Sequence, residues 1–278
     1  KLKQVAAHDA VRMFELKLSQ GAKPGKGGIL PAAKVTDEIA GIRGIAAGQA
    51  SLSPNRHPEM ENFGDLLDMI THIRAVTGKP VGIKTVVGSE AVMRELFDCI
   101  KTRDDDAAPD FITIDGGEGG TGAAPMPLID LVGMSVREAL PMVANLRDEY
   151  GLKDRIRLIS SGKLVNPGDV AWALAAGADF VTSARGFMFA LGCIQALQCN
   201  KNTCPTGITT HNPKLQFGLD PTSKSERVAN YAKNMKKEIS VIAHSCGVAE
   251  PRLLKRYHAR IVLDNGRSVS MDELFQEP

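Results

Sequence analysis

The sequence of 278 residues predicts an α/β fold, a TIM-type (β/α)8 barrel that lacks its first strands. Short runs rich in Val, Ile and Phe alternate with amphipathic stretches of helical period, which is the pattern of parallel βαβ units. Glycine and polar residues gather after these runs, at the strand ends where a barrel places its active site. About six runs are present where a closed barrel has eight, so we expect the first two strands to lie upstream of residue 1. An open sheet of about six strands is the alternative.

The expected strands are short and apolar, as buried parallel strands are. They span residues 14–19, 81–86, 111–115, 157–161 and 180–183, with a shorter one at 50–53. Helices are expected between them, because Asn62, Ser89 and Asn166 stand where N-cap residues would precede helical runs. Ser135 and Glu138 have the spacing of a capping box.

The end of the chain has a different pattern. We divide the chain into a partial barrel over residues 1–212 and a C-terminal helical and hairpin extension over 213–278 that packs on it. One amphipathic helix is expected over 226–244. Asn265-Gly266 predicts the turn of a hairpin over 261–269. No chemistry is expected from this extension.

Composition excludes several classes of protein. The net charge is +2, with 34 Lys and Arg against 32 Asp and Glu, so no basic excess indicates a nucleic-acid partner. The longest apolar stretch, residues 187–197, is about half a membrane span and contains Gln195. The five cysteines are too few and odd in number for a secreted disulfide scaffold. We therefore expect a cytoplasmic protein with no membrane segment in this chain.

Three of the cysteines lie close together: Cys193, Cys199 and Cys204. A structural zinc site needs four ligands, usually in paired C-x2–4-C units, and a redox disulfide favours C-x-x-C. Thiolates also hold iron–sulfur clusters, and a proline after the last cysteine, here Pro205, occurs in bacterial ferredoxin motifs. Three ligands without a fourth favour a three-iron cluster. Three buried thiols that pack as small apolar side chains are the alternative.

Two loops after the last expected strands have the composition of a phosphate site. They contain Ser161, Gly162 and Lys163, and Ser183, Ala184 and Arg185. Barrel loops in this position commonly bind phosphate through backbone N–H groups and a helix N-terminus. No G-x-G-x-x-G motif opens a βαβ unit, so a mononucleotide is expected rather than a dinucleotide. Simple turn geometry is the alternative explanation of the glycines.

Three ordered motifs carry a family resemblance. The segment GCIQALQCNKNTCPTG at residues 192–207 resembles the 3Fe–4S segment of the large subunit of glutamate synthase, and every fixed position of that pattern matches. The segment KLSQGAKPGKGG at 17–28 resembles a substrate loop of the same family, and DGGEGGTG at 115–122 resembles its glycine-rich turn. The resemblance covers roughly residues 10–210, and in the family this region is the C-terminal part of an FMN-binding barrel.

The resemblance implies roles for specific residues. Lys84 would lie beside the flavin ring, where a cation stabilises the negative charge of reduced flavin, although a lysine that extends to the barrel rim is the alternative. The cofactor FMN would be bound by Gly119, Gly120, Thr121, Ser161, Gly162, Lys163, Ser183, Ala184 and Arg185. The 3Fe–4S cluster would be held by Cys193, Cys199 and Cys204.

The resemblance also implies a dicarboxylate substrate, held by Lys17, Gln20, Lys23 and Arg43. Charge-assisted hydrogen bonds to carboxylates favour such residues. The sequence departs from the family at Ile29, where the family has a glutamine that also touches the substrate. The lost hydrogen bond would cost about 1–2 kcal/mol of binding. We expect 2-oxoglutarate to bind more weakly than in the large synthases.

The activity that the resemblance implies is reduction of 2-iminoglutarate, made from 2-oxoglutarate and ammonia, to L-glutamate by an FMN- and iron–sulfur-dependent oxidoreductase that acts on CH–NH2 donors. Electrons would come from a ferredoxin or an NAD(P)H reductase subunit, and ammonia from solution or from a glutaminase domain or subunit. Two alternatives remain: an N-methylglutamate synthase-type methylamine–glutamate transferase, and a non-catalytic iron–sulfur electron-transfer subunit.

Overall fold

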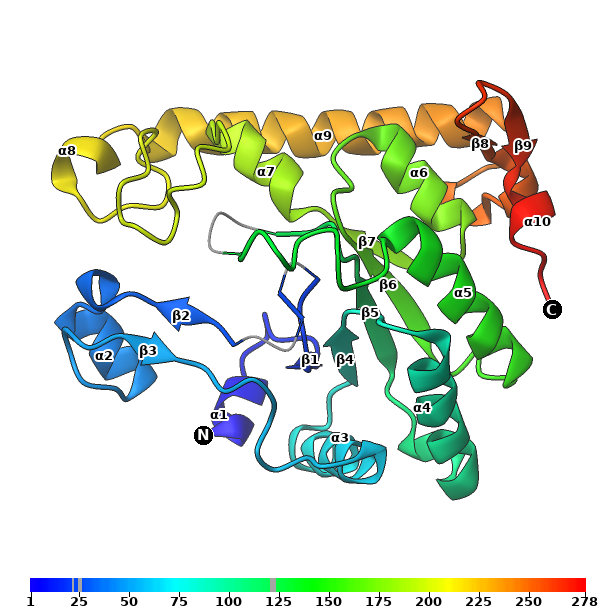
Figure 1. Ribbon diagram of the computed structural model, residues 1–278, viewed down its shortest axis with the longest axis horizontal. Coiled ribbons are helices and arrows are strands. Elements are labelled where there is room, and N and C mark those ends of the chain that lie inside the picture. The colour runs from blue at the N-terminus through cyan, green and yellow to red at the C-terminus, as the bar shows by residue number, and fades with distance from the viewer. Residues whose placement is uncertain (22, 25–26, 121–123) are drawn as a thin grey trace.

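A parallel sheet of five strands forms the centre of the computed structural model, which describes residues 1–21, 23–24, 27–120 and 124–278 (Figure 1). The strands are β1 (Phe14–Lys17), β4 (Val81–Thr85), β5 (Phe111–Asp115), β6 (Arg157–Ser161) and β7 (Phe180–Thr182). They are hydrogen-bonded in the order β1-β4-β5-β6-β7, and every neighbouring pair is parallel. The α/β prediction is confirmed, and each long predicted strand is present within a residue or two of its predicted ends.

The middle of the sheet is apolar because helices cover it. All five residues of β5 are buried, and Ile83, Ile112, Ile114 and Leu158 are at most 1% exposed. The helices α3 (Phe63–Thr77), α4 (Glu90–Arg103), α5 (Val136–Glu149) and α6 (Pro167–Ala175) connect consecutive strands and pack beside them (Figure 1). Their apolar faces join the strands in one core, as the spacing of these residues predicts.

Three predicted helix starts are confirmed. The side chains of Asn62, Ser89 and Asn166 each accept a hydrogen bond from a backbone N–H in the first turn of α3, α4 and α6. The capping box predicted at Ser135 is wrong, because this side chain makes no cap hydrogen bond. The carboxylate of Glu118 takes its place and accepts from the N–H of Val136 at 2.9 and 3.0 Å.

The short strand expected near residues 50–53 does not join the parallel sheet. β3 (Ser51–Leu52) instead pairs antiparallel with β2 (Ile29–Leu30). This two-stranded ribbon, with η1 (Ala32–Lys34) and α2 (Asp37–Arg43), forms a lobe beside the main sheet (Figure 1). Two residues pair too few backbone groups to add a strand to the core, and Leu52 is 70% exposed.

The short remaining elements of the barrel region are α1 (Leu2–Ala6), η2 (Asp105–Ala107) and α7 (Ala184–Leu191), which follows β7. The C-terminal elements are α8 (Pro213–Gln216), α9 (Pro221–Ser245), η3 (Pro251–Leu253), η4 (Arg256–His258), β8 (Arg260–Val262), β9 (Ser268–Ser270) and α10 (Met271–Leu274).

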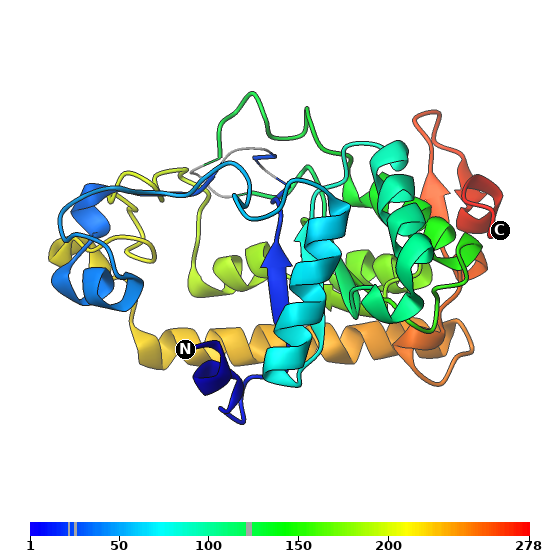
Figure 2. The same ribbon diagram turned by 90° about the horizontal axis from the view of Figure 1, so that it is seen from below.

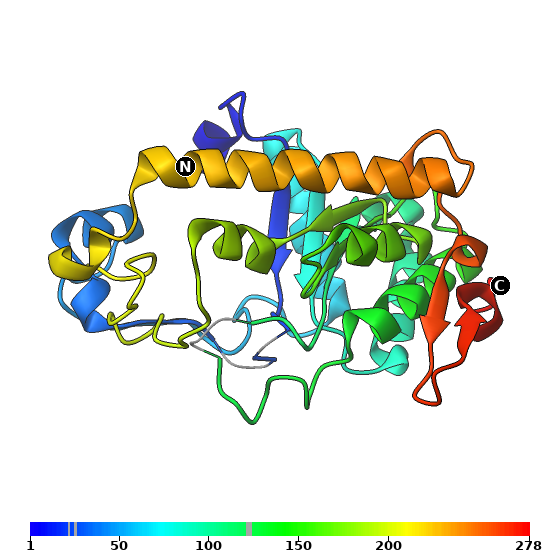
Figure 3. The ribbon, with the colours of Figure 1, turned by 90° about the horizontal axis from the view of Figure 1, so that it is seen from above.

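The long helix α9 ties the end of the chain to the sheet region. It runs alongside α6 and α7, as Figures 2 and 3 show from opposite sides. The predicted hairpin is present as the antiparallel pair β8 and β9, with Gly266 at φ 77° in its turn. The division of the chain at residue 212 stays a prediction. None of the helices in the described ranges is both long and apolar enough to cross a membrane.

Candidate active site

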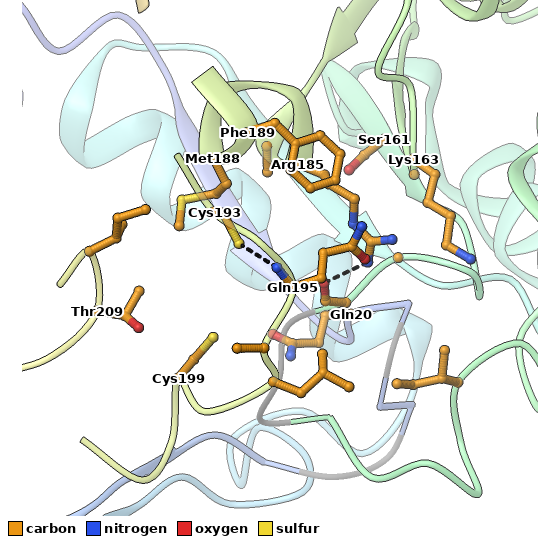
Figure 4. Close-up of a pocket in the computed structure, with 18 of the residues that line it drawn as sticks. Gln20, Ser161, Lys163, Arg185, Met188, Phe189, Cys193, Gln195, Cys199 and Thr209 are labelled. Carbon is orange, nitrogen blue, oxygen red and sulfur yellow. Dashed lines mark hydrogen bonds between the residues drawn. The ribbon is translucent and has the colours of Figure 1, made fainter. Parts of the chain in front are cut away.

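A cavity of about 310 Å³ opens at the carboxyl ends of the central strands (Figure 4). One wall comes from Lys84 on β4 and from the loops after β1, β5, β6 and β7, and the other comes from residues 193–209. Of the residues predicted from the sequence, those that line it are Gln20, Lys84, Gly119, Gly120, Ser161, Gly162, Lys163, Ala184, Arg185, Cys193, Cys199 and Cys204. Motifs far apart in the sequence therefore meet because parallel strands end at one edge of the sheet.

A cationic group stands at the β1–β4 side of the cavity. Lys17 and Lys84 are direct neighbours across these strands. The Lys17 ammonium donates to the Gln20 side chain. Although much of Lys17 is exposed, loss of solvent around its amine, followed by the charge of Lys84, lowers its pKa. Lys23 is buried, at 8% exposure. These clustered ammonium groups favour the binding of an anion at this side of the cavity.

Asp115, the last residue of β5, is the acidic member of the site, and sequence reasoning did not select it. Its carboxylate lies 3.4 Å from the Lys84 ammonium. It also accepts hydrogen bonds from the Gly21 N–H at 2.9 Å and from the Ser161 hydroxyl at 2.7 Å. Its position at a strand end before a glycine-rich turn was the available signal.

The expected phosphate loops form a cradle of backbone. Gly162 has φ 139°, and a Cβ there would lie 3.1 Å from the backbone nitrogen of Gly116, so a side chain does not fit. Ser183 precedes α7 but makes no cap hydrogen bond, since its hydroxyl donates to the Leu164 carbonyl at 2.6 Å. The first N–H groups of α7 are therefore free of a side-chain cap from Ser183.

Two basic side chains stand at this cradle. Arg185 donates to the Gly120 carbonyl at 3.0 Å, and the Lys163 ammonium lies 3.2 Å from Asp130. Both line the cavity, with Ser161, in Figure 4. The arrangement of N–H groups, a helix N-terminus and two cations is suited to a phosphate group.

The three clustered cysteines line the same cavity on the side away from Ser161 and Lys163, where Figure 4 shows Cys193 and Cys199. Burial raises the pKa of the Cys204 thiol, but hydrogen bonds involving Thr206 and Thr209 outweigh this and lower it to about 6. Thr206 Oγ1 lies 3.4 Å from that sulfur. The Thr209 hydroxyl makes no hydrogen bond of ordinary geometry within the described ranges, so Thr206 is the firmer contact.

These thiols are not assembled as a metal site. Across the residues that the structure describes, no three His, Cys, Asp or Glu side chains are grouped to hold a metal ion. The donor chemistry suits an iron–sulfur cluster, since three soft thiols share one cavity.

Several predicted residues lie away from the cavity. Arg43 is the exposed last residue of α2, and Ile29 is 54% exposed in β2. Lys17, Lys23, Arg43 and Ser183 are not among the described residues that line the cavity. Thr121 lies outside the described residues. Sequence reasoning missed Lys34, whose ammonium contacts the cysteine segment, and no sequence pattern singled it out.

The sequence matches a known family over most of its length. Residues 6–249 match the family model described as a conserved region in glutamate synthase. The chain is 43% identical over 269 residues to a glutamate synthase large subunit-like protein of Bacillus subtilis, covering 97% of this chain and 51% of that protein. It is 36% identical over 262 residues to an archaeal glutamate synthase (NADPH) of Methanocaldococcus jannaschii, covering 94% and 49%. The chain spans about half the length of these curated relatives.

Solved structures share the architecture at low sequence identity. A flavocytochrome b2 variant with pyruvate bound superposes with a TM-score of 0.50 at 17% identity, over 88% of this chain and 47% of the other. The recombinant flavin-binding domain of baker's yeast flavocytochrome b2 gives a TM-score of 0.50 at 15% identity, over 92% and 56%. This likeness concerns the fold alone.

Proposed function

The chain belongs to the glutamate synthase family, and we propose that this protein binds FMN in this cavity and reduces 2-iminoglutarate to L-glutamate. The imine would form from 2-oxoglutarate and ammonia. One observation carries the proposal: Lys84, Gly162 and Arg185, from three separate segments of the chain, line one cavity at the strand ends.

The phosphate of FMN would be held by the cradle. Gly162, at φ 139°, lets its loop pack against the Gly116 backbone, and the start of α7 offers backbone N–H groups. Lys163 and Arg185 add positive charge. The chemistry that reduced FMN supplies is hydride transfer to a carbon–nitrogen double bond.

The dicarboxylate would be bound at the cationic side. Lys84 contributes a positive charge at the cavity wall, and Lys17 and Gln20 are linked to each other beside it. Charge-assisted hydrogen bonds from such groups orient a carboxylate. Lys23 and Arg43 remain proposed ligands of the second carboxylate, which would require Arg43 to approach from its present place at the end of α2.

The three cysteines would hold a 3Fe–4S cluster that passes electrons to the flavin. The support is that Cys193, Cys199 and Cys204 line the FMN cavity itself. Ligation would require their sulfurs to gather more closely than they do here. A ferredoxin or an NAD(P)H reductase subunit would supply the electrons, and a glutaminase domain or subunit is one source of ammonia.

The test uses the full-length protein, reduced anaerobically and given 2-oxoglutarate with 15N-ammonium. We expect 15N-glutamate by mass spectrometry, and a loss of at least about ten-fold in rate for Lys84→Met, from removal of one charge at the reaction site. Lys237→Met, an exposed residue of α9, is the matched control. N-methylglutamate formed from methylamine and glutamate would favour the transferase instead. Absence of both products with a cluster present would favour an electron-transfer subunit.

A further inference from the structure

Asp115 contacts three separate parts of the site, and none of the proposed steps uses it. We infer that Asp115 is a positioning residue that holds the substrate loop after β1 and the Lys84 side chain against the phosphate side of the cavity, and balances the charge of its lysines. This inference rests on the proposed function, which names the two ligands that these parts would bind.

The carboxylate of Asp115 has a donor on each side. One oxygen accepts from the Ser161 hydroxyl at 2.7 Å. The other accepts from the Gly21 N–H at 2.9 Å and lies 3.4 Å from the Lys84 ammonium. The side chain is only 12% exposed, so these contacts are shielded from water. An ionised carboxylate accepts from all three without supplying a proton.

The contact to Gly21 is made at a close approach of two backbones. A Cβ at Gly21 would lie 1.8 Å from the carbonyl oxygen of Gly116, so the loop touches the turn after β5 directly. Gly21 is buried there. Its N–H must find an acceptor, and Asp115 provides it. Loss of that acceptor should release the loop that contains Gln20 and Lys23.

The charge of Asp115 opposes a concentration of lysines. Burial and then Lys84 lower the pKa of Lys17, with a smaller effect from Lys23, whereas Asp115 and Glu15 raise it. The His57 ring also lies near Lys17, 3.0 Å from its backbone carbonyl oxygen. Neutralising Asp115 would lower the pKa of Lys17 further, and its ammonium would be lost at a lower pH.

Two substitutions separate the hydrogen bonds from the charge. Asp115→Asn keeps the volume and one acceptor oxygen but removes the charge, whereas Asp115→Ala removes both. Asp264→Asn, in the exposed turn of the hairpin, is the control for net charge. The full-length flavoprotein is titrated with 2-oxoglutarate by calorimetry from pH 6 to 9, and loop 17–28 is followed by hydrogen exchange.

We expect Asp115→Asn to keep loop protection and FMN content but to lose 2-oxoglutarate affinity on the alkaline side, by up to about ten-fold for each unit of pKa shift. Asp115→Ala should also lose protection at Gly21. A wild-type pH profile in Asp115→Asn would overturn the charge role, and unchanged exchange in Asp115→Ala would overturn the positioning role. If the wild type binds no 2-oxoglutarate, the proposed function fails. Hydrogen exchange at the Gly21 amide in Asp115→Ala still tests the positioning role of Asp115 in that case.

Discussion

The ammonium group of Lys34 lies 2.7 Å from the backbone carbonyl oxygen of Cys199. It also donates to the carbonyl oxygen of Thr209 at 2.5 Å. One side chain of η1 therefore joins the lobe of β2 and β3 to two points of the cysteine segment. Because these carbonyls have no role in regular secondary structure, the lysine orders a segment that lacks its own hydrogen-bond ladder.

Lys34→Met should loosen this segment. Two partly buried hydrogen bonds to a charged group are lost, which we estimate at about 1–2 kcal/mol after allowing for solvent, or about ten-fold in local opening. Thiol labelling of Cys199 and Cys204, measured by mass spectrometry on protein without metal, should accelerate accordingly. Lys236→Met, exposed on α9, serves as control. Equal labelling rates in Lys34→Met and wild type would show that the lysine does not hold the segment.

Glu118→Ala should destabilise α5 more than Ser135→Ala. The carboxylate of Glu118 is the acceptor at the helix start, and Ser135 makes no cap hydrogen bond. Loss of a cap costs about 1 kcal/mol, whereas a surface serine change is worth about 0.5 kcal/mol or less. Chemical denaturation of both variants measures the difference. If Ser135→Ala were the more destabilising of the two, the Ser135 capping box predicted from the sequence would be supported instead.

The fold was predictable where local signals agree with tertiary packing. The strands at residues 111–115 and 157–161 were predicted with their observed ends, because apolar runs bounded by turns leave little ambiguity. The Ser135 cap failed because its replacement, Glu118, comes from a loop 18 residues away through a contact between β5 and α5. Short pairs such as β2 and β3 depend on a register that sequence period does not specify.

The stability of the start of α9 should depend on pH through Asp220. Its carboxylate accepts from the N–H groups of Ser223 at 3.0 Å and Thr222 at 3.3 Å, and the Ser223 contact above all lowers its pKa. A lowered folded pKa stabilises the helix end above the unfolded pKa of about 3.9, and that contribution is lost as pH falls through the folded value. Amide exchange in the first turn of α9 should lose its protection on acidification.

Two variants check this cap. Asp220→Asn, which still accepts hydrogen bonds, should show protection that does not change with pH, and Asp220→Ala should lack it throughout. Protection in the wild type that increases on acidification would contradict the sign of the effect.

Arg256→Met should release the C-terminal tail. Arg256 is 4% exposed, and its guanidinium donates to the carbonyl oxygens of Phe275 at 2.6 Å, Pro141 at 3.4 Å and Ala176 at 3.5 Å. Three carbonyls, of the buried Pro141 and Ala176 and the half-buried Phe275, would lose a charged donor, at a cost of about 2–4 kcal/mol. Limited proteolysis should cut residues 250–278 faster than in wild type, while Arg252→Met, exposed in the same tail, should not differ. Equal cleavage of the two variants would show that Arg256 is dispensable.

The motifs of the site could be predicted from the sequence, but the contacts between residues distant in the chain could not. Glycine-rich loops and clustered cysteines are local patterns, so Gly162, Arg185 and Cys199 could be selected from the sequence. Asp115 and Lys34 act through partners distant in the chain, Gly21 and Cys199, and a single acidic or basic residue carries no such information. Only the folded structure brings these residues together.

The FMN content of the purified full-length protein tests the central claim most directly. Gly162→Val would press a side chain against the Gly116 backbone at φ 139° and so displace the proposed phosphate loop, and Gly151→Val is matched to it, with φ 68° but open space around its Cβ position. Extraction and mass spectrometry should give about one FMN per chain in wild type and Gly151→Val, and at least about ten-fold less in Gly162→Val, for a loss of 1.4 kcal/mol or more. FAD or no flavin in the wild type, or full FMN in Gly162→Val, would contradict the assignment of this cavity.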